Sequence, residues 1–284
     1  MMKSDMAERA PWLIRRIPAG GIEQVQGLID DLNLHTVCRS ASCPNLGECF
    51  HSGTATFLIL GGICTRGCRF CGVPKGDPPP VDEAEAENVA IAVARMGLKH
   101  AVVTSVTRDD LPDGGAEQFA ACIRNIRAKD AKVTVEVLTP DFAGNRQSLQ
   151  IVLNERPDVF NHNVETVPRL YEQVRPRANY QQSLNVLGQA AECGIVWVKS
   201  GLMLGLGETE AEVLDVFADL RQVGVNSLTV GQYLRPTREH LPVVDYIHPD
   251  RFAFLAEEAK RMGFVHIASG PLVRSSYHAG EVFR

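Results

Sequence analysis

Short apolar runs alternate with longer amphipathic segments along most of the chain after residue 55. The runs are rich in Val, Ile and Leu, which is typical of parallel strands buried on both faces. We expect strands at Thr56–Ile63, Ala101–Ser105, Val133–Leu138, Val159–Asn163, Val196–Leu204 and Ser227–Gln232, with Val265–Ala268 as a further candidate.

Between these runs, apolar residues recur three and four positions apart, which is the period of an amphipathic helix. In the first such segment Val89, Val93 and Met96 share one face, and Gly97 stands where a glycine would end the helix. Alternating strands and helices indicate a parallel sheet, so we predict an α/β fold, a partial (β/α)6 TIM-type barrel whose mouth is covered by both extensions. The other expected helices are Ile22–Leu32, Ala116–Ala128, Gln182–Cys193, Glu210–Val223 and Arg251–Met262.

The pattern contains no linker, so we predict one globular unit in three stretches. Residues 1–55 form an N-terminal extension, 56–264 the barrel and 265–284 a C-terminal tail. In α/β barrels the carboxyl ends of the strands carry the active site. Unusual polar residues stand at those predicted ends, namely Cys64, Thr104, Asn163, Glu165, Lys199 and Gln232.

Composition excludes several classes of function. The chain has 284 residues and a net charge of -5, with no cluster of basic residues, which argues against nucleic acid as a partner. The longest apolar stretch is too short for a membrane helix, and the N-terminus lacks the apolar core of a secretory signal. We therefore expect a cytoplasmic protein that binds neither nucleic acid nor membrane.

Six of the eight cysteines lie between Cys38 and Cys71, and clustered cysteines without a secretory signal indicate metal ligands rather than disulfides. Cys64, Cys68 and Cys71 have the spacing C-x3-C-x2-C. Three thiolates can hold three irons of a four-iron, four-sulfur cluster and leave the fourth iron open to a chelating small molecule. Zinc, with His35 or His51 as a further ligand, stays open on spacing alone. A second set, Cys38, Cys43 and Cys49, has the spacing C-x4-C-x5-C.

The segment C-T-R-G-C-R-F-C, with aromatic Phe70 before its last cysteine, resembles the signature of the radical S-adenosylmethionine (SAM) superfamily. The resemblance implies that the open iron binds the methionine part of SAM. It also implies that one electron from the cluster frees a 5′-deoxyadenosyl radical, which abstracts hydrogen from an unactivated carbon.

The segments H-T-V-C-x4-C-P-N-L-G-E-C and Arg274-Ser275-Ser276-Tyr277 resemble lipoyl synthases, over about residues 11–280. This resemblance implies an auxiliary 4Fe-4S cluster on Cys38, Cys43 and Cys49, with Ser275 as its oxygen ligand. The implied reaction cleaves two SAM molecules and moves two sulfur atoms from that cluster to C6 and C8 of a protein-bound octanoyl-lysine. Arg39 departs from the family pattern, which usually has an acidic residue there.

Other polar residues at strand ends are candidates for holding SAM. Related radical enzymes use an N-H-N-x-acid segment for the ribose, which implies this role for Asn163 and Glu165; Phe70, Thr104 and Ser105 are further candidates. Lys199 could bind a carboxylate. Alternatively, its aliphatic stem could lie along the end of the barrel with the ammonium group in solvent, and the sequence does not decide between the two. Arg108, Asp109 and Asp110 suggest a charge network at the rim.

The resemblance also implies partners. They are octanoylated lipoyl carrier domains (E2 subunits of 2-oxoacid dehydrogenases and the glycine cleavage H protein), a ferredoxin or flavodoxin as electron donor, and iron–sulfur assembly proteins. Two alternatives stay open. A biotin-synthase-like sulfur inserter would need Cys64, Cys68 and Cys71 but not Cys38, Cys43 and Cys49. A non-enzymatic metal-binding module would not explain the polar strand ends.

Overall fold

The computed structural model describes residues 10–13, 22–40, 43, 45–51, 55–195, 197–277 and 279–280. Within them, one sheet of eight strands runs in chain order from β1 to β8. The first pair is antiparallel and every later pair is parallel. The strands are β1 (His35–Thr36), β2 (Thr56–Ile59), β3 (His100–Ser105), β4 (Thr134–Leu138), β5 (Val159–Asn161), β6 (Trp197–Leu204), β7 (Ser227–Gln232) and β8 (His266–Gly270).

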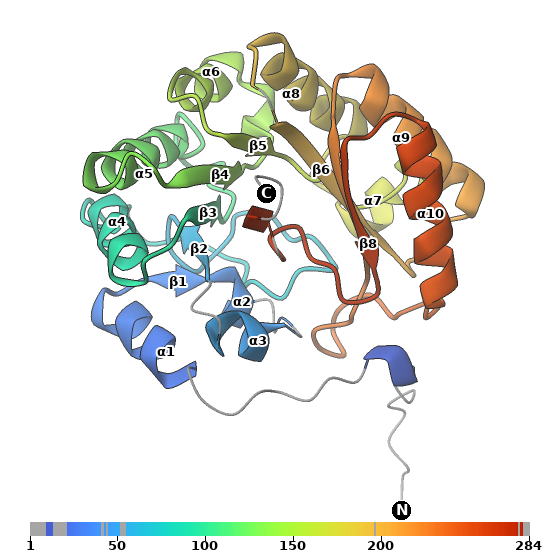
Figure 1. Cartoon of the computed structure of the whole chain (residues 1–284), viewed down its shortest axis with the longest axis horizontal. Coiled ribbons are helices and arrows are strands. Elements are labelled where there is room, and N and C mark those ends of the chain that lie inside the picture. Colours follow the sequence, from blue (N-terminus) through green and yellow to red (C-terminus); the bar gives the residue numbers. More distant parts are fainter. Residues whose placement is uncertain are drawn as a thin grey trace, which may run out of the picture.

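Helices cover the outer face of this sheet, as Figure 1 shows. Their apolar stripes are buried against the strands; in α4, for example, Val89 and Ala90 have no exposed surface. The α-helices are α1 (Ile22–Asp31), α2 (Val37–Ser40), α3 (Leu46–His51), α4 (Glu85–Arg95), α5 (Ala116–Lys129), α6 (Arg146–Asn154), α7 (Tyr171–Val174), α8 (Tyr180–Glu192), α9 (Glu210–Gln222) and α10 (Pro249–Arg261). Short 3-10 helices lie at Pro11–Leu13, Phe142–Gly144 and Pro168–Leu170.

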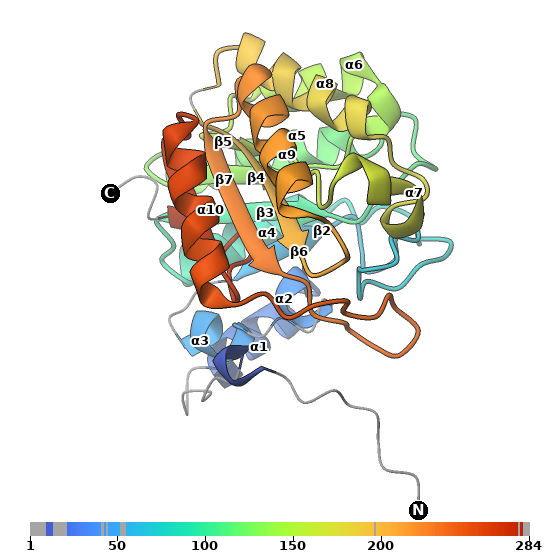
Figure 2. The same ribbon diagram turned by 90° about the vertical axis from the view of Figure 1, so that its right-hand side faces the viewer.

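The sheet curves but does not close, because β1 and β8 are its two edges and do not pair. This confirms the predicted partial barrel. Figure 2 shows the arrowheads of β6 and β7 pointing toward the side where α2 and α3 lie. The N-terminal segment is therefore on the side of the carboxyl ends of β6 and β7, and in this class of fold the carboxyl ends of the strands form the mouth.

Several element boundaries differ from the expectation. β2 ends at Ile59, since Leu60 (φ 68°) and Gly61 (φ 85°) turn the chain out of the sheet. β8 lies within the stretch assigned to the tail; the division into three stretches stays a prediction. The pattern missed β1, which is only two residues long, the short helices α2, α3 and α7, and the longer α6. No helix among the described residues is long and apolar enough to cross a membrane.

Candidate active site

The loop that carries Cys64, Cys68 and Cys71 leaves the sheet at the turn after β2. A left-handed conformation at Leu60 is unusual for a residue with a side chain and needs support from its surroundings. The buried carboxylate of Glu85 supplies it by accepting hydrogen bonds from the backbone N–H groups of Leu60 (2.8 Å) and Gly61 (3.3 Å). Helix α4 therefore fixes the direction in which the cysteine loop starts.

The three thiols of this loop are half-buried, and all eight cysteines of the chain are free. Cys64 Sγ accepts hydrogen bonds from the backbone N–H groups of Thr107 (3.3 Å) and Arg66 (3.4 Å). Burial raises the pKa of Cys71 to about 12, and burial also raises the pKa of Cys68 against the opposing charge of Arg175. Iron binding must therefore displace protons from these thiols.

Asn163 and Glu165 lie together at the end of β5. Asn163 Nδ2 donates to Glu165 Oε1 (3.1 Å), and Glu165 has a left-handed backbone (φ 68°). Its backbone bridges to β6 through Gly201 O (3.0 Å) and the N–H of Met203 (2.9 Å), which holds that conformation in place. Burial raises the pKa of the Glu165 carboxyl, although Arg175 opposes the shift.

The other residues expected around SAM have different surroundings. Thr104 Oγ1 donates to Leu138 O (2.9 Å), whereas the buried Ser105 Oγ has no hydrogen-bond partner in the structure. Phe70 packs at the edge of the core. Lys199 is 1% exposed, and its Nζ lies 2.9 Å from Glu136 Oε1. The ammonium group is thus already neutralised inside the barrel, and its predicted role in binding SAM stays a prediction.

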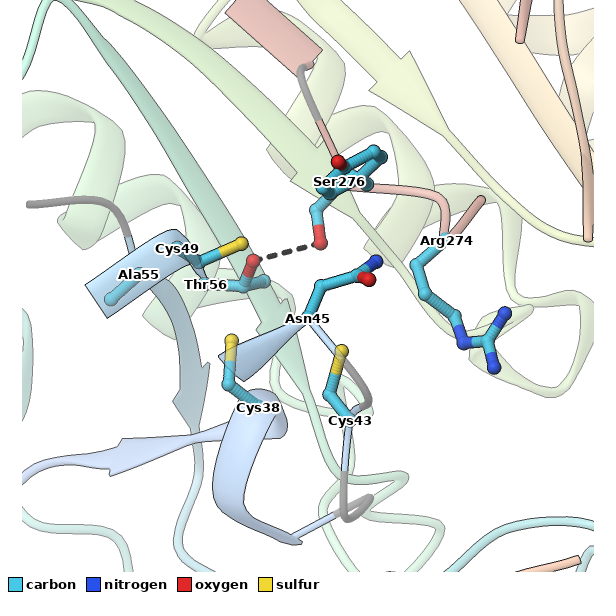
Figure 3. Close-up of a pocket in the computed structure, with 9 residues that line it drawn as sticks. Cys38, Cys43, Asn45, Cys49, Ala55, Thr56, Arg274 and Ser276 are labelled. Atoms are coloured by element: carbon cyan, nitrogen blue, oxygen red, sulfur yellow. Dashed lines mark hydrogen bonds between the residues drawn. The ribbon is translucent and has the colours of Figure 1, made fainter. Parts of the chain in front are cut away.

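The second cysteine set lines a pocket outside the barrel. Figure 3 shows the sulfur atoms of Cys38, Cys43 and Cys49 around a common space, with the Ser276 hydroxyl on its far side. Burial raises the pKa of the Cys38 thiol, and hydrogen bonds from Thr56 partly oppose that shift. The full lining is Cys38, Cys43, Asn45, Cys49, Ala55, Thr56, Arg274, Ser276 and Tyr277.

Three hydrogen bonds tie the C-terminal tail to this pocket. Asn45 Nδ2 donates to Leu272 O (2.7 Å), Thr56 Oγ1 donates to Ser276 Oγ (2.8 Å), and Tyr277 Oη donates to Glu48 Oε1 (2.9 Å). Ser275 is half-buried but is not among the residues that line the pocket. The expected role of Ser275 as oxygen ligand is therefore untested, and its neighbour supplies the hydroxyl on the pocket wall.

Both cysteine sets supply three free thiols, and cysteine thiolates are the usual ligands of iron–sulfur clusters. The residues present therefore fit one such cluster in each set. The unpartnered Ser105 Oγ and Asn163 Oδ1 provide hydrogen-bonding capacity suited to a polar molecule such as SAM at the mouth.

Several residues of the site could not be singled out from the sequence. Glu85 and Arg175 carry charges, which are typical of solvated surfaces, yet both are buried. His240 Nε2 lies 2.9 Å from Cys71 O and joins the cysteine loop to the segment after β7. The expected charge network at the rim consists of two separate ion pairs. Arg108 pairs with Asp110, and Asp109 pairs with Arg66.

A partial barrel with three cysteines on the loop after its first parallel strand defines a radical SAM enzyme, and residues 58–220 match the family model described as the radical SAM superfamily. The chain is 54% identical over 276 residues to a lipoyl synthase of Caldanaerobacter subterraneus, covering 96% of this chain and 97% of that one. A lipoyl synthase of Oleidesulfovibrio alaskensis is 57% identical over 270 residues, covering 95% and 92%. The chain belongs to the lipoyl synthase family.

Solved structures agree on the fold. The chain is similar to HydG, a maturase of the [FeFe]-hydrogenase, with a TM-score of 0.57 and 14% identity over 93% of this chain and 74% of that one. Methylornithine synthase (PylB) gives a TM-score of 0.54 at 12% identity, covering 92% and 85%. The protein is thus a radical SAM sulfurtransferase whose cofactors are SAM and two 4Fe-4S clusters.

Proposed function

We propose that the two cysteine sets divide the work of inserting sulfur at C6 and C8 of an octanoyl chain on a carrier-domain lysine. The observation that carries this is the presence of two separate three-thiol sites, one at the barrel mouth and one walled by the tail. Cys64, Cys68 and Cys71 would hold the cluster that binds SAM. Cys38, Cys43 and Cys49 would hold the cluster that donates sulfur. When bound, these groups supply the radical and the sulfur atoms.

The protein's own residues would orient SAM and exclude water. Asn163 Oδ1 is buried without a partner and can accept a hydrogen bond from a ribose hydroxyl. Glu165 lies beside it and offers a second acceptor, while Thr104, Ser105 and Phe70 would line the same mouth. Lys199 is paired with Glu136, so it would bind the carboxylate of SAM only if this ion pair were shared.

The oxygen ligand of the auxiliary site is proposed to come from the serine pair. The family resemblance implies Ser275, whereas the geometry of the pocket supports Ser276, whose hydroxyl faces the cysteines (Figure 3). We assign the role to Ser276. Thr56 holds that hydroxyl in place from the first residue of β2.

The finer partners also belong to this proposal. We expect the octanoyl chain to arrive on E2 subunits or the glycine cleavage H protein, in the cytoplasm, with iron–sulfur assembly proteins loading the clusters. A ferredoxin or flavodoxin would reach the cysteine loop across a basic surface. Hydrogen bonds join the segments that form it, including Arg177 Nη1 to Thr65 O (2.8 Å) and Leu241 N to Arg69 O (3.1 Å). Its exposed cations are Arg69, Lys75, Arg177, Arg235 and Arg238.

Anaerobic single-turnover mass spectrometry of an octanoyl-lysyl peptide with reduced, iron-loaded protein and SAM tests the proposal. We expect the peptide to gain sulfur and lose hydrogen, with matching 5′-deoxyadenosine. Cleavage of SAM without sulfur gain would move the substrate elsewhere, as in a biotin-synthase-like enzyme. Absence of cleavage in loaded protein would reduce the chain to a metal-binding module.

A further inference from the structure

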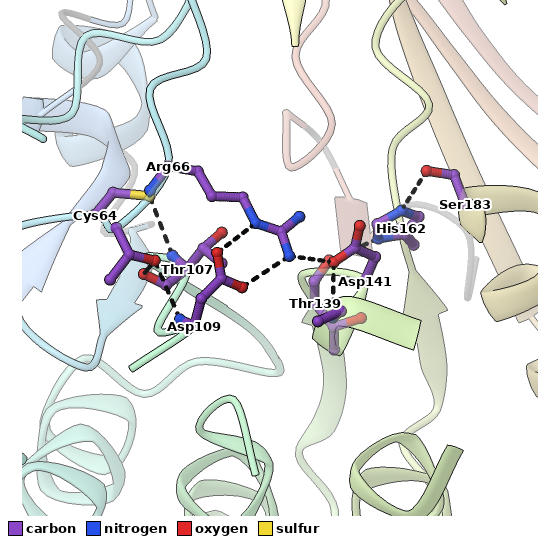
Figure 4. A network of polar contacts seen from close by, with 10 residues as sticks. Cys64, Arg66, Thr107, Asp109, Thr139, Asp141, His162 and Ser183 are labelled. Carbon is purple, nitrogen blue, oxygen red and sulfur yellow. Dashed lines mark hydrogen bonds and ion pairs between the residues drawn. The ribbon is translucent and has the colours of Figure 1, made fainter. Parts of the chain in front are cut away.

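Arg66 lies in the cysteine loop between Cys64 and Cys68, and its side chain is only 7% exposed. Its guanidinium group binds Asp109 in a two-pronged arrangement, through Nε to Oδ2 (2.8 Å) and Nη2 to Oδ1 (2.8 Å). Nη2 also lies 2.7 Å from Asp141 Oδ1. Figure 4 shows this network joining the loop to the segments that follow β3 and β4. A forked pair of this kind fixes the orientation of the guanidinium group as well as balancing its charge.

The acidic partners are themselves anchored in the barrel. Asp141 is 1% exposed and accepts a hydrogen bond from the N–H of Ala143 (3.0 Å). Burial alone would raise the pKa of Asp141, but the hydrogen bond and charge of Arg66 outweigh it and leave that pKa at about 2. Asp109 is joined to the loop a second time, because its N–H donates to Thr65 Oγ1 (3.1 Å).

This network surrounds the two backbone donors to Cys64 Sγ. One donor is the N–H of Arg66 itself, and the other belongs to Thr107, two residues before Asp109. Thr65 adds two further bonds to Thr107 O, from its N–H (3.0 Å) and its Oγ1 (3.0 Å). The Arg66–Asp109 pair therefore closes a short ring that sets the distance from both N–H groups to the sulfur.

Hydrogen bonds to ligand sulfurs are among the factors that set the reduction potential of an iron–sulfur cluster. A donor aimed at a thiolate sulfur favours the more negative, reduced state. We propose that Arg66 is a positioning residue that holds the N–H groups of Arg66 and Thr107 on Cys64 Sγ and thereby raises the reduction potential of the cluster on this loop. This inference rests on the proposed ligand role of Cys64.

The test is a redox titration of the loaded enzyme followed by electron paramagnetic resonance. The two clusters are told apart because SAM changes the spectrum only of the cluster with an open iron. Arg66→Lys keeps the charge but loses the fork, and Asp109→Asn removes one partner. Both should shift the midpoint potential of this cluster to more negative values. A donor of fixed potential then reduces a smaller fraction of the cluster, so 5′-deoxyadenosine should form about 10- to 100-fold more slowly with that donor, the range typical of outer-shell partners of metal ligands. The KM for SAM should change little.

Asp110→Asn is the matched control, because Asp110 is an adjacent carboxylate that pairs with Arg108 and not with Arg66. Its potential should equal that of the wild type. Wild-type potentials in fully loaded Arg66→Lys and Asp109→Asn proteins would overturn the inference. If Arg66→Lys does not retain iron, Asp109→Asn decides alone. If SAM does not change the spectrum of the wild-type protein, the assignment of Cys64 as a ligand of the SAM-binding cluster is wrong. This inference then fails with it.

Discussion

Cys64, Cys68 and Cys71 lie on a loop that the barrel holds from several sides, whereas Cys38, Cys43 and Cys49 lie outside the barrel and are enclosed by the other end of the chain. The first loop is held by Glu85, Arg66 and backbone bonds to the segment after β3. The second depends on helices of four and six residues and on contacts between residues 220 to 229 positions apart.

This difference suits the two proposed tasks. A cluster that only transfers electrons benefits from a fixed surrounding, because its potential depends on nearby hydrogen bonds. A cluster that is taken apart and rebuilt needs a wall that opens without unfolding the core. Segments with few buried contacts open at low free energy. Cys38 and Phe50 belong to the main core, whereas residues 273–277 of the tail are only half-buried, so the tail is the part of the wall that we expect to open. We therefore expect the C-terminal tail to be a cover that opens more readily than the surroundings of Cys64, Cys68 and Cys71.

The largest expected effect comes from removing one cysteine of each set. Cys68→Ala should abolish SAM cleavage, because the cluster that binds SAM loses a ligand. Cys43→Ala should retain cleavage but form no lipoyl product, since only the sulfur source is lost. Each variant should hold about half of the wild-type iron, one cluster instead of two. Iron analysis and product mass spectrometry measure both outcomes. Identical defects in the two variants would contradict the proposed division of roles between the two clusters.

The second effect concerns the serines at the pocket wall. Ser276→Ala should weaken retention of the auxiliary iron at least about 10-fold, the lower end of effects seen for supporting groups around metals. Ser275→Ala should stay within about twofold of the wild type, as is usual for a side chain outside the site. Chelator challenge followed by iron analysis gives the comparison. A reversed order would return the ligand role to Ser275.

Acid should affect the barrel mouth through His162. Burial, and next the charge of Arg175, lower the pKa of this histidine to about 4 from an ordinary value of 6.5. The folded state therefore binds fewer protons than the unfolded state between these values, and stability should fall by up to about 3 kcal/mol as the pH drops from 6.5 to 4. Above pH 6.5 the contribution of His162 to stability should not change with pH.

Denaturant unfolding of iron-free protein across pH 4–7 measures this slope. His162→Gln should flatten it, because glutamine does not titrate there. Cys38, at the other site, has its pKa raised above 9 and cannot contribute in this window. An unchanged slope in His162→Gln would place the acid sensitivity elsewhere in the molecule.

The smallest expected effect concerns the cover of the auxiliary pocket. Tyr277→Phe removes the hydroxyl that donates to Glu48, a bond worth about 1 kcal/mol, so residues 272–277 should exchange amide hydrogens about fivefold faster. Tyr233→Phe is the matched control, since it removes a similar bond to Leu241 O inside the barrel. Equal exchange of the tail in both variants would contradict a detachable cover.

Local pattern was enough for seven of the eight strands and six of the ten α-helices among the described residues, because period and spacing are properties of neighbouring residues. It could not assign Lys199, whose partner Glu136 comes from a strand two places away in the sheet. Nor could it choose between Ser275 and Ser276, which depends on the turn closed by the N–H of Tyr277 and Arg274 O (3.0 Å). The pattern could not single out Arg66, because its partners Asp109 and Asp141 are brought to it only by the fold of the barrel.

The bond between Asn45 and Leu272 joins residues 227 positions apart. During synthesis at roughly 5–20 residues per second, Leu272 is added roughly 10 to 45 s after Asn45. Cys38, Cys43 and Cys49 are therefore synthesised well before the C-terminal residues that enclose their pocket. In that interval the three thiols are open to iron delivery and equally to oxidation, so the order of translation itself creates a period in which this half of the enzyme needs protection.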